Sequence, residues 1–253
     1  MHSPGFIRLT IMVLLLTGSC YGPRMQAQQS GNVTTTEQEF LDAIKKGNLD
    51  RVSELLKLSP ALIKASTKNG ATPVLLAVYA GHSEIAEALL ASGIEPNIFE
   101  AAATGRVERV RELLKQDASL VKAYSPDGWT AFHLNFGNLE IAKLLLDAGA
   151  DINAVSKNKF SATPLQGAAA FQNIDLAKFL IAHGADVNCR GEGGGSPLHE
   201  AAGSGQIDFA KLLLDNGAQL NARDDNGKTP LTIAIEYKQL EMVKFLRERK
   251  AIQ

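Results

Sequence analysis

The sequence predicts an all-α protein built from one helix–turn–helix unit that recurs along the chain. Thr163, Ser196 and Thr229 stand 33 residues apart, and each is followed directly by proline. A Ser or Thr side chain caps a helix by accepting a free N–H of its first turn, and proline costs no hydrogen bond at the first helical position. Hydrophobic residues form 45% of the chain but aromatic residues only 6%, which suits helices packed through alanine and leucine. Helix starts at a fixed interval therefore indicate stacked helical repeats.

The clearest repeat runs from Ser196 to Asn221. It opens Ser-Pro-Leu-His-Glu-Ala-Ala, passes through Gly205, and ends in an apolar run before Gly217. Both glycines stand where a helix ends in a left-handed backbone conformation that other residues resist. The repeat resembles an ankyrin repeat, whose T-P-L-H-x-A signature and 33-residue period it shares. The resemblance implies an ankyrin-repeat solenoid of stacked helix–turn–helix units with β-turn finger loops.

Residues 1–27 are predicted to be a signal peptide. Residues 7–16 are mostly apolar and include Arg8 near their start, and small polar residues follow them. About ten apolar residues are too few to cross a hydrocarbon core of ~30 Å at 1.5 Å per residue, so a signal fits better than a membrane span.

The end of this segment has three alternatives. Cleavage after Ala27 gives a free protein, and a lipoprotein-type signal ends at Cys20, which would then be lipidated. An uncleaved signal keeps Met1 and holds the protein at the membrane. Thr17 stands where the lipidation motif prefers leucine. We expect a bacterial-type exported protein, periplasmic, secreted or anchored to the cell envelope by lipid. Residues 28–36 are predicted to be a flexible tether and residues 37–253 the repeat domain.

Seven repeats are expected from the turn between the paired helices. The turn positions are Gly47, Gly81, Gly105, Gly137, Gln172, Gly205 and Lys238. A second helix with two adjacent apolar residues follows each turn. Helical spacing, as from Ile85 to Leu89, places these residues on one stripe that we expect to be buried.

The first four repeats indicate the duplication of a two-repeat block. A shift of 58 residues superimposes Gly47 on Gly105 and Thr72 on Thr130. The short join at Glu95-Pro96-Asn97 leaves little room for a finger loop before the third repeat.

The fourth repeat departs most from the pattern. Only Asn135 and Phe136 separate Leu134 from the turn at Gly137, two residues fewer than the repeat requires. We therefore expect a shortened first helix and weaker coupling across this repeat, because a solenoid is stabilised mainly between neighbours.

Bulk properties and motifs give no sign of catalysis. The net charge of −1 provides no field that would attract nucleic acid or an anionic membrane surface. Cys20 and Cys189 are the only cysteines, which excludes a disulfide framework. Every histidine except His2 falls at a repeat position, and the resemblance implies that His133 and His199 hydrogen-bond between adjacent loops. With no metal-ligand spacing and no nucleophile–base pair, we expect no catalytic, metal or cofactor site.

Ankyrin-like arrays bind through their finger tips and through a concave face formed by the eighth and ninth residues from each capping position. Aromatic residues at these places are the predicted contacts, because aromatic side chains often dominate interface energies. They are Tyr79, Trp129, Phe136, Phe171 and Tyr237. Two structural alternatives stay open: Phe136 fills the gap left by the missing residues, and Tyr237 packs on the last repeat.

These patterns predict a monomeric, non-catalytic adaptor that binds another protein through its concave face and fingers. An inhibitor or immunity-type protein that occludes an envelope enzyme or toxin is the alternative. An enzyme is the third hypothesis, and it has the least support because no residue cluster lies outside the repeat pattern.

Overall fold

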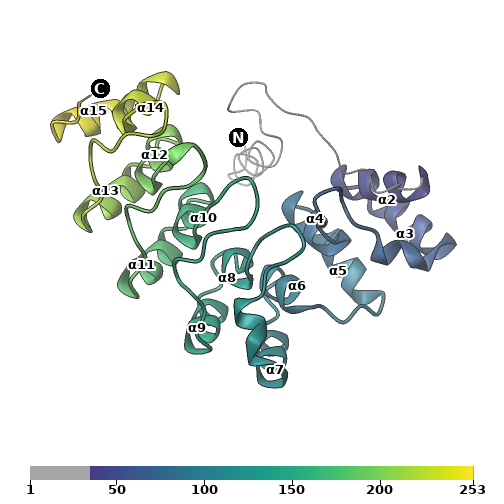
Figure 1. Cartoon of the computed structure of the whole chain (residues 1–253). Coiled ribbons are helices and arrows are strands. Elements are labelled where there is room, and N and C mark those ends of the chain that lie inside the picture. The colour runs from purple at the N-terminus through teal and green to yellow at the C-terminus, as the bar shows by residue number, and fades with distance from the viewer. Residues whose placement is uncertain (1–34, 253) are drawn as a thin grey trace. The chain divides into compact units, whose positions relative to one another are not determined.

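The structure, a computed structural model, describes residues 35–252, which contain fourteen α-helices (Figure 1). They follow one another in seven pairs: α2 (Thr35–Lys45) with α3 (Leu49–Leu58), α4 (Pro73–Tyr79) with α5 (Ser83–Ala91), α6 (Ile98–Ala103) with α7 (Val107–Gln116), α8 (Ala131–Leu134) with α9 (Leu139–Asp147), α10 (Pro164–Ala170) with α11 (Ile174–Ala182), α12 (Pro197–Gly203) with α13 (Ile207–Asp215), and α14 (Pro230–Glu236) with α15 (Leu240–Glu248).

Three short 3-10 helices lie in the connections: η1 (Pro60–Lys64), η2 (Ala118–Lys122) and η3 (Glu192–Gly194). The described part of the chain contains no strand beyond one isolated bridge between Tyr124 and Thr130. The all-α prediction is confirmed there.

The N-terminal predictions fall mostly outside the described residues. These are the signal peptide at residues 1–27, lipidation of Cys20 and most of the tether. Helix α2 begins at Thr35, two residues before the expected start of the domain at Glu37.

The helix starts follow the predicted capping chemistry. The Thr163 hydroxyl accepts from the Gln166 N–H at 3.4 Å, and Thr229 accepts from Thr232 N–H at 3.3 Å. Several second helices start instead at asparagine, as at Asn173, whose side-chain oxygen accepts from a first-turn N–H at 2.9 Å. Each cap satisfies a backbone donor that would otherwise have no partner.

The predicted turn register is confirmed at every position. All seven turn residues have a positive φ: Gly47 72°, Gly81 77°, Gly105 73°, Gly137 94°, Gln172 56°, Gly205 69° and Lys238 57°. Gln172 and Lys238 therefore adopt a conformation that favours glycine. The turn geometry holds where the sequence does not supply glycine.

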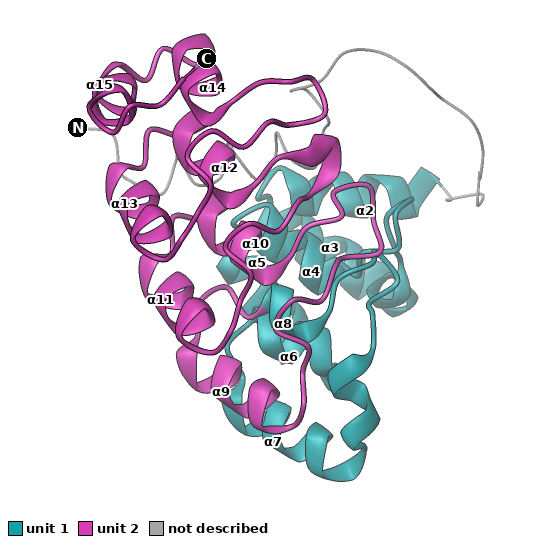
Figure 2. Ribbon diagram, turned by 60° about the vertical axis from the view of Figure 1, so that its left-hand side comes forward, with its two compact units in different colours: residues 1–134 teal, residues 135–253 magenta. Residues whose placement is uncertain are grey.

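The chain divides into two compact units, residues 1–134 and 135–253 (Figure 2). In the described part of unit 1, the first helices α2, α4, α6 and α8 contact one another in order. In unit 2, α10, α12 and α14 do the same, and so do the second helices α11, α13 and α15. Each unit is therefore a row of stacked helix pairs, as expected for a repeat protein.

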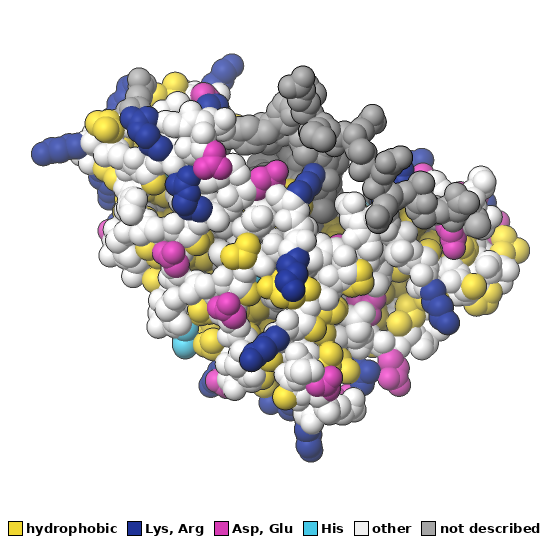
Figure 3. All heavy atoms as spheres, in the orientation of Figure 1, with side chains coloured by type: hydrophobic (Ala, Val, Ile, Leu, Met, Phe, Trp, Pro, Cys, Tyr) yellow, Lys and Arg dark blue, Asp and Glu magenta, His cyan; other side chains and the backbone are white. Residues whose placement is uncertain are grey.

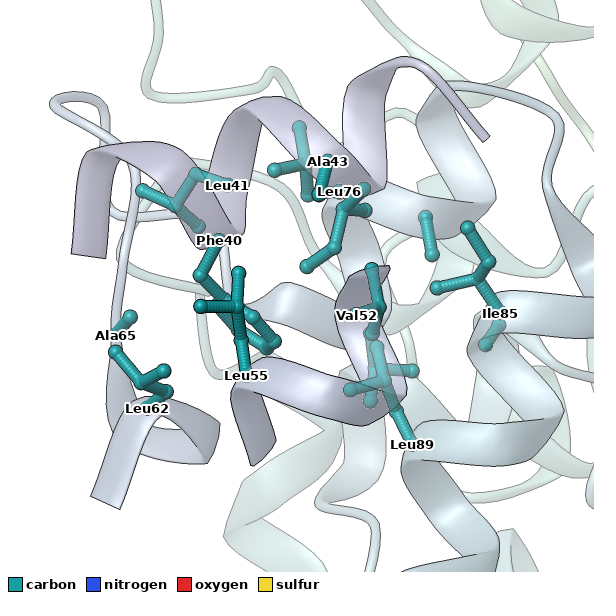
Figure 4. Packing of buried hydrophobic residues seen from close by; sticks show 14 of the residues in the cluster. Phe40, Leu41, Ala43, Val52, Leu55, Leu62, Ala65, Leu76, Ile85 and Leu89 are labelled. Carbon is teal, nitrogen blue, oxygen red and sulfur yellow. The ribbon is translucent and has the colours of Figure 1, made fainter. Parts of the chain in front are cut away.

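The second helices bury the predicted apolar stripe. In every one except α7, a member of the adjacent apolar pair is at most 2% exposed: Leu55, Leu89, Leu145, Leu180, Leu213 and Leu246. In unit 1, the side chains of Phe40, Val52 and Leu55 meet between α2 and α3 (Figure 4). Helix α7 follows the prediction only partly, because Leu113 and Leu114 are half-buried and Val110 alone is buried.

The fourth pair has the shortened first helix that the missing residues predict. Helix α8 has four residues, whereas α4, α10, α12 and α14 have seven each. Phe136 and Gly137 follow with φ of 44° and 94°, so two successive left-handed residues make the turn. The boundary between the two compact units falls next to this helix, between Leu134 and Asn135.

Candidate protein-binding surface

The predicted concave-face residues lie at the C-terminal ends of the first helices. We call these positions the helix-end surface of their unit. In unit 1 it comprises Tyr79-Ala80 and Ala103-Thr104, and in unit 2 it comprises Phe136, Ala170-Phe171, Gly203-Ser204 and Glu236-Tyr237. Ala80, Thr104, Phe171, Ser204 and Tyr237 are the C-cap residues of their helices.

Tyr79 is a buried residue, so the expectation of an exposed aromatic side chain is wrong there. Its side chain is 3% exposed, and its hydroxyl donates to Asp127 Oδ2 at 2.8 Å. Burial raises the pKa of Tyr79 well above its usual value, and the Asp127 charge raises it further. The phenol therefore stays protonated and holds the finger that carries Asp127.

Tyr79 is buried because no finger loop precedes the third helix pair. Only six residues separate α5 from α6, and the finger before the fourth pair contacts the finger before the second. A Cβ placed on Gly70 would lie 2.8 Å from Cβ of Pro126. Because no third finger separates them, the later finger reaches back and brings Asp127 to Tyr79.

Trp129 lies on this same finger and is half-buried. The backbone N–H of Trp129 donates to the Ser125 hydroxyl at 3.0 Å, and its backbone carbonyl accepts from the Ser125 N–H at 2.7 Å. The indole ring lies 5.4 Å from the His133 ring, centroid to centroid. The finger backbone thus fixes Trp129, which keeps part of its surface exposed.

A shallow apolar cavity of about 240 Å³ also lies in unit 1. Glu87 at the cavity forms an ion pair with Arg106. Small residues provide most of the remaining lining, including two members of the helix-end surface: Val78, Gly81, Ser83, Ala86, Ala103 and Thr104.

In unit 2 the structure brings two of the predicted residues together. The rings of Phe136 and Phe171 meet edge to face, with centroids 5.2 Å apart and planes at 87°. Both remain half-buried, and this geometry is favourable for aromatic pairs. The pair forms because the shortened fourth repeat places Phe136 directly at the turn.

Tyr237 is the most exposed of the five, at 49%. It caps the C-terminus of α14 and lies beside α12, since a Cβ placed on Gly203 would be 3.9 Å from its Cδ2 atom. One edge of the ring packs on the neighbouring helix, and about half of the residue is exposed to solvent.

Sequence reasoning missed a second set of residues that supports this surface. In four places the side chain of the residue after the turn forms a hydrogen bond with a backbone carbonyl of an earlier helix pair. These bonds are His82 to Lys45 at 3.2 Å, Asn173 to Phe136 at 3.5 Å, Gln206 to Ala169 at 3.0 Å, and Gln239 to Gly203 at 2.8 Å. A polar residue recurring directly after the turn was the available signal. These bonds fix successive helix ends within each unit.

The finger loops of unit 2 are joined in a similar way. His199 Nε2 bonds the Lys228 carbonyl at 3.0 Å, and Gln166 Nε2 bonds the Gly195 carbonyl at 2.9 Å. The expected role of His199 between loops is confirmed. His133 Nδ1 lies 2.8 Å from the Thr130 hydroxyl of its own repeat, as His199 Nδ1 does from the Ser196 hydroxyl.

A family model described as ankyrin repeats (3 copies) matches residues 12–100, 135–224 and 165–253. The chain belongs to the ankyrin-repeat family. These matches leave out residues 101–134, which contain the second half of α6, all of α7 and the shortened α8. Ankyrin repeats generally mediate protein–protein interactions, and the family is typically non-catalytic.

Three relatives share parts of this ankyrin-repeat sequence. The chain is 32% identical over 132 residues to ankyrin repeat and SAM domain-containing protein 6 of Rattus norvegicus, and 40% identical over 128 residues to that of Mus musculus. It is 29% identical over 129 residues to alpha-latrocrustotoxin-Lt1a of Latrodectus tredecimguttatus. The matches cover 50%, 49% and 47% of this chain but only 12%, 11% and 9% of those proteins.

Residues 35–252 contain no group of three His, Cys, Asp or Glu side chains placed to hold a metal ion. None of the helices in that range is long and apolar enough to cross a membrane. Burial raises the pKa of Cys189 to about 11, and its sulfur lies 3.1 Å from the Thr163 hydroxyl. This thiol is therefore protonated and poorly reactive at neutral pH.

Charges are mixed over the face of the molecule shown in Figure 3, with basic and acidic side chains interspersed. This distribution agrees with the net charge of −1. Neither property favours a polyanionic partner.

Proposed function

We propose that this ankyrin-repeat protein is a non-catalytic adaptor that binds another protein through its helix-end surface and finger loops. The observation that carries the proposal is the partial exposure of Trp129, Phe136, Phe171 and Tyr237 outside the buried stripe. Aromatic side chains that are held in place yet exposed contribute large contact areas at little entropic cost, and they dominate many interfaces.

We further propose that each of the seven helix pairs is one ankyrin repeat and that the protein acts as a monomer. The seven left-handed turns support this division of the chain. The hydrogen bonds from the side chains after the turns to earlier carbonyls support a pre-organised surface, because contacts that are already fixed lower the entropic cost of binding.

We also propose that the protein is bacterial in type and is exported, with residues 1–27 as its signal. The support is the short apolar run after Arg8. The mass of the mature N-terminus tests this. Lipidated Cys20 or a start directly after Ala27 supports export with a cleaved signal, and an intact Met1 in the mature protein contradicts cleavage at either position.

Tyr237→Ala is expected to weaken binding to the partner about tenfold, because the substitution removes a large exposed aromatic contact. A partner captured from an extract of the source organism and then purified would be titrated against both proteins. Leu58→Ala is the control, since Leu58 is 73% exposed and belongs to the second helix α3, not to the helix-end positions. Equal affinities of the wild type and the folded Tyr237→Ala variant would contradict the proposal.

A further inference from the structure

The finger that carries Trp129 cannot form a backbone hydrogen bond that joins neighbouring fingers in unit 2. There, the residue four positions before the cap donates its backbone N–H to a carbonyl of the preceding finger. These bonds are Glu192 to Phe160 at 2.8 Å, before the cap Ser196, and Asp225 to Gly193 at 2.9 Å, before the cap Thr229. The residue four positions before Thr130 is Pro126, which has no N–H to donate.

Side-chain hydrogen bonds connect this finger to helix α4 instead. The Tyr79 hydroxyl donates to Asp127 Oδ2 at 2.8 Å, and the Ser125 hydroxyl donates to Asp127 Oδ1 at 2.5 Å. The Ser125 oxygen also accepts from the backbone N–H of Trp129 at 3.0 Å. Two side chains thus link the Tyr79 hydroxyl to the backbone of Trp129.

Tyr79 is the only aromatic residue at its place in the repeats. It lies two residues before the turn residue Gly81, and three other repeats have a small residue there: Ala103, Ala170 and Gly203. Those repeats stack without an aromatic ring at this place. Because Tyr79 is 3% exposed, it can act on a binding surface only through the residues that it contacts.

We propose that Tyr79 is a positioning residue: through Asp127 and Ser125, its hydroxyl fixes the finger that presents Trp129 to the partner protein. Trp129 is half-buried beside the His133 ring, so the conformation of the finger decides which part of the indole faces the partner. A contact that is ordered only part of the time binds with a correspondingly lower apparent affinity. This inference rests on the proposed protein-binding function and adds a residue that acts on it without touching the partner.

The fluorescence of Trp129 tests the inference without a partner, because Trp129 is the only tryptophan of the chain. Tyr79→Phe keeps the buried ring and removes only the hydroxyl. Trp129 in this variant is expected to lose fluorescence anisotropy and to be quenched more strongly by acrylamide, at unchanged helix content. Tyr237→Phe is the matched control, because it removes a helix-end hydroxyl in unit 2 and should leave both signals unchanged. Wild-type signals from Tyr79→Phe would overturn the inference.

Binding is measured with random dodecapeptides that are displayed on phage and selected against the immobilised full chain. Peptides are kept if Trp129→Ala abolishes their binding. Their affinity for Tyr79→Phe should fall about tenfold, because a hydrogen bond to a charged group no longer holds the finger. Asp127→Ala breaks the same connection without changing the buried ring and should weaken binding similarly. The double variant should bind no more weakly than Asp127→Ala alone, and additive losses would contradict a shared connection.

The outcomes separate this inference from the binding function. Peptides that require Trp129 yet bind Tyr79→Phe as tightly as the wild type overturn the positioning role and leave the binding function standing. A wild type that selects no peptide through Trp129 contradicts the binding function of this finger, and the inference fails with it. A less stable Tyr79→Phe with wild-type fluorescence and peptide affinity would assign Tyr79 a purely structural role, which also contradicts the inference.

Discussion

Gly137→Ala is expected to lower the free energy of unfolding by about 2–3 kcal/mol. Two effects combine in this estimate. Gly137 has a φ of 94°, and a left-handed conformation costs a residue with a Cβ about 1–2 kcal/mol. The new Cβ would also overlap Nδ2 of Asn173, whose side chain caps α11. Displacing that cap costs about 1 kcal/mol more.

Gly217→Ala separates the two effects. Gly217 has a φ of 88° but nothing within 4 Å of a Cβ, so only the backbone cost of about 1–2 kcal/mol applies. Urea denaturation of both variants measures the difference. Equal losses of stability would show that the contact between Gly137 and Asn173 contributes nothing. Combining each glycine variant with Asn173→Ala should show coupling only for Gly137.

His199→Ala is expected to cost about 3 kcal/mol. The side chain is 5% exposed and joins two finger loops. Its Nε2 lies 3.0 Å from the Lys228 carbonyl, which can only accept, so Nε2 carries the proton. Its Nδ1 then accepts from the Ser196 N–H at 3.1 Å. Removing the ring leaves a cavity and a Ser196 N–H without its partner, whereas the Lys228 carbonyl keeps the hydrogen bond from the Asp224 N–H at 2.9 Å.

The same geometry makes stability depend on pH. Burial lowers the pKa of His199 below its ordinary value of 6.5, and the bond to the Lys228 carbonyl offsets this only in part. A protonated Nδ1 would be a donor that faces the Ser196 N–H, which is also a donor, so this hydrogen bond would be lost. The unfolded chain therefore binds more protons than the folded chain just below pH 6.5. The contribution of His199 is complete above that pH and is lost as the pH falls through the folded-state pKa.

His199→Gln provides the matched variant, because the chain already uses glutamine at this position. Gln166 donates to the Gly195 carbonyl at 2.9 Å and accepts from the Thr163 N–H at 3.0 Å. His199→Gln should therefore keep stability within about 1 kcal/mol and remove this part of the acid sensitivity. Denaturation at pH 7 and pH 5 measures both effects. An unchanged pH dependence in His199→Gln would show that another group is responsible.

Local patterns predicted the features of the fold that depend on neighbouring residues. Capping residues followed by proline mark the helix starts, and the turn register extends to Gln172 and Lys238. The two missing residues after Leu134 correctly predicted a short α8. These features follow from backbone geometry, which a few adjacent residues determine.

Features that depend on a missing loop, or on residues far apart in the sequence, could not be predicted from local patterns. Tyr79 is buried because a finger is missing between its repeat and Asp127, 48 residues away. Phe136 meets Phe171 because the shortened repeat displaces it toward the next turn. The burial of an aromatic side chain thus depends on the length of neighbouring repeats, and the pattern of its own repeat does not reveal it.

Site-specific photo-crosslinking tests the central claim of a helix-end binding surface most directly. A benzophenone amino acid would replace Tyr237 on that surface or Lys211, an exposed residue of the second helix α13. Irradiation in an extract of the source organism is expected to give a discrete covalent adduct with a partner protein from position 237 and none from position 211. An adduct from position 211 with none from position 237 would contradict the account.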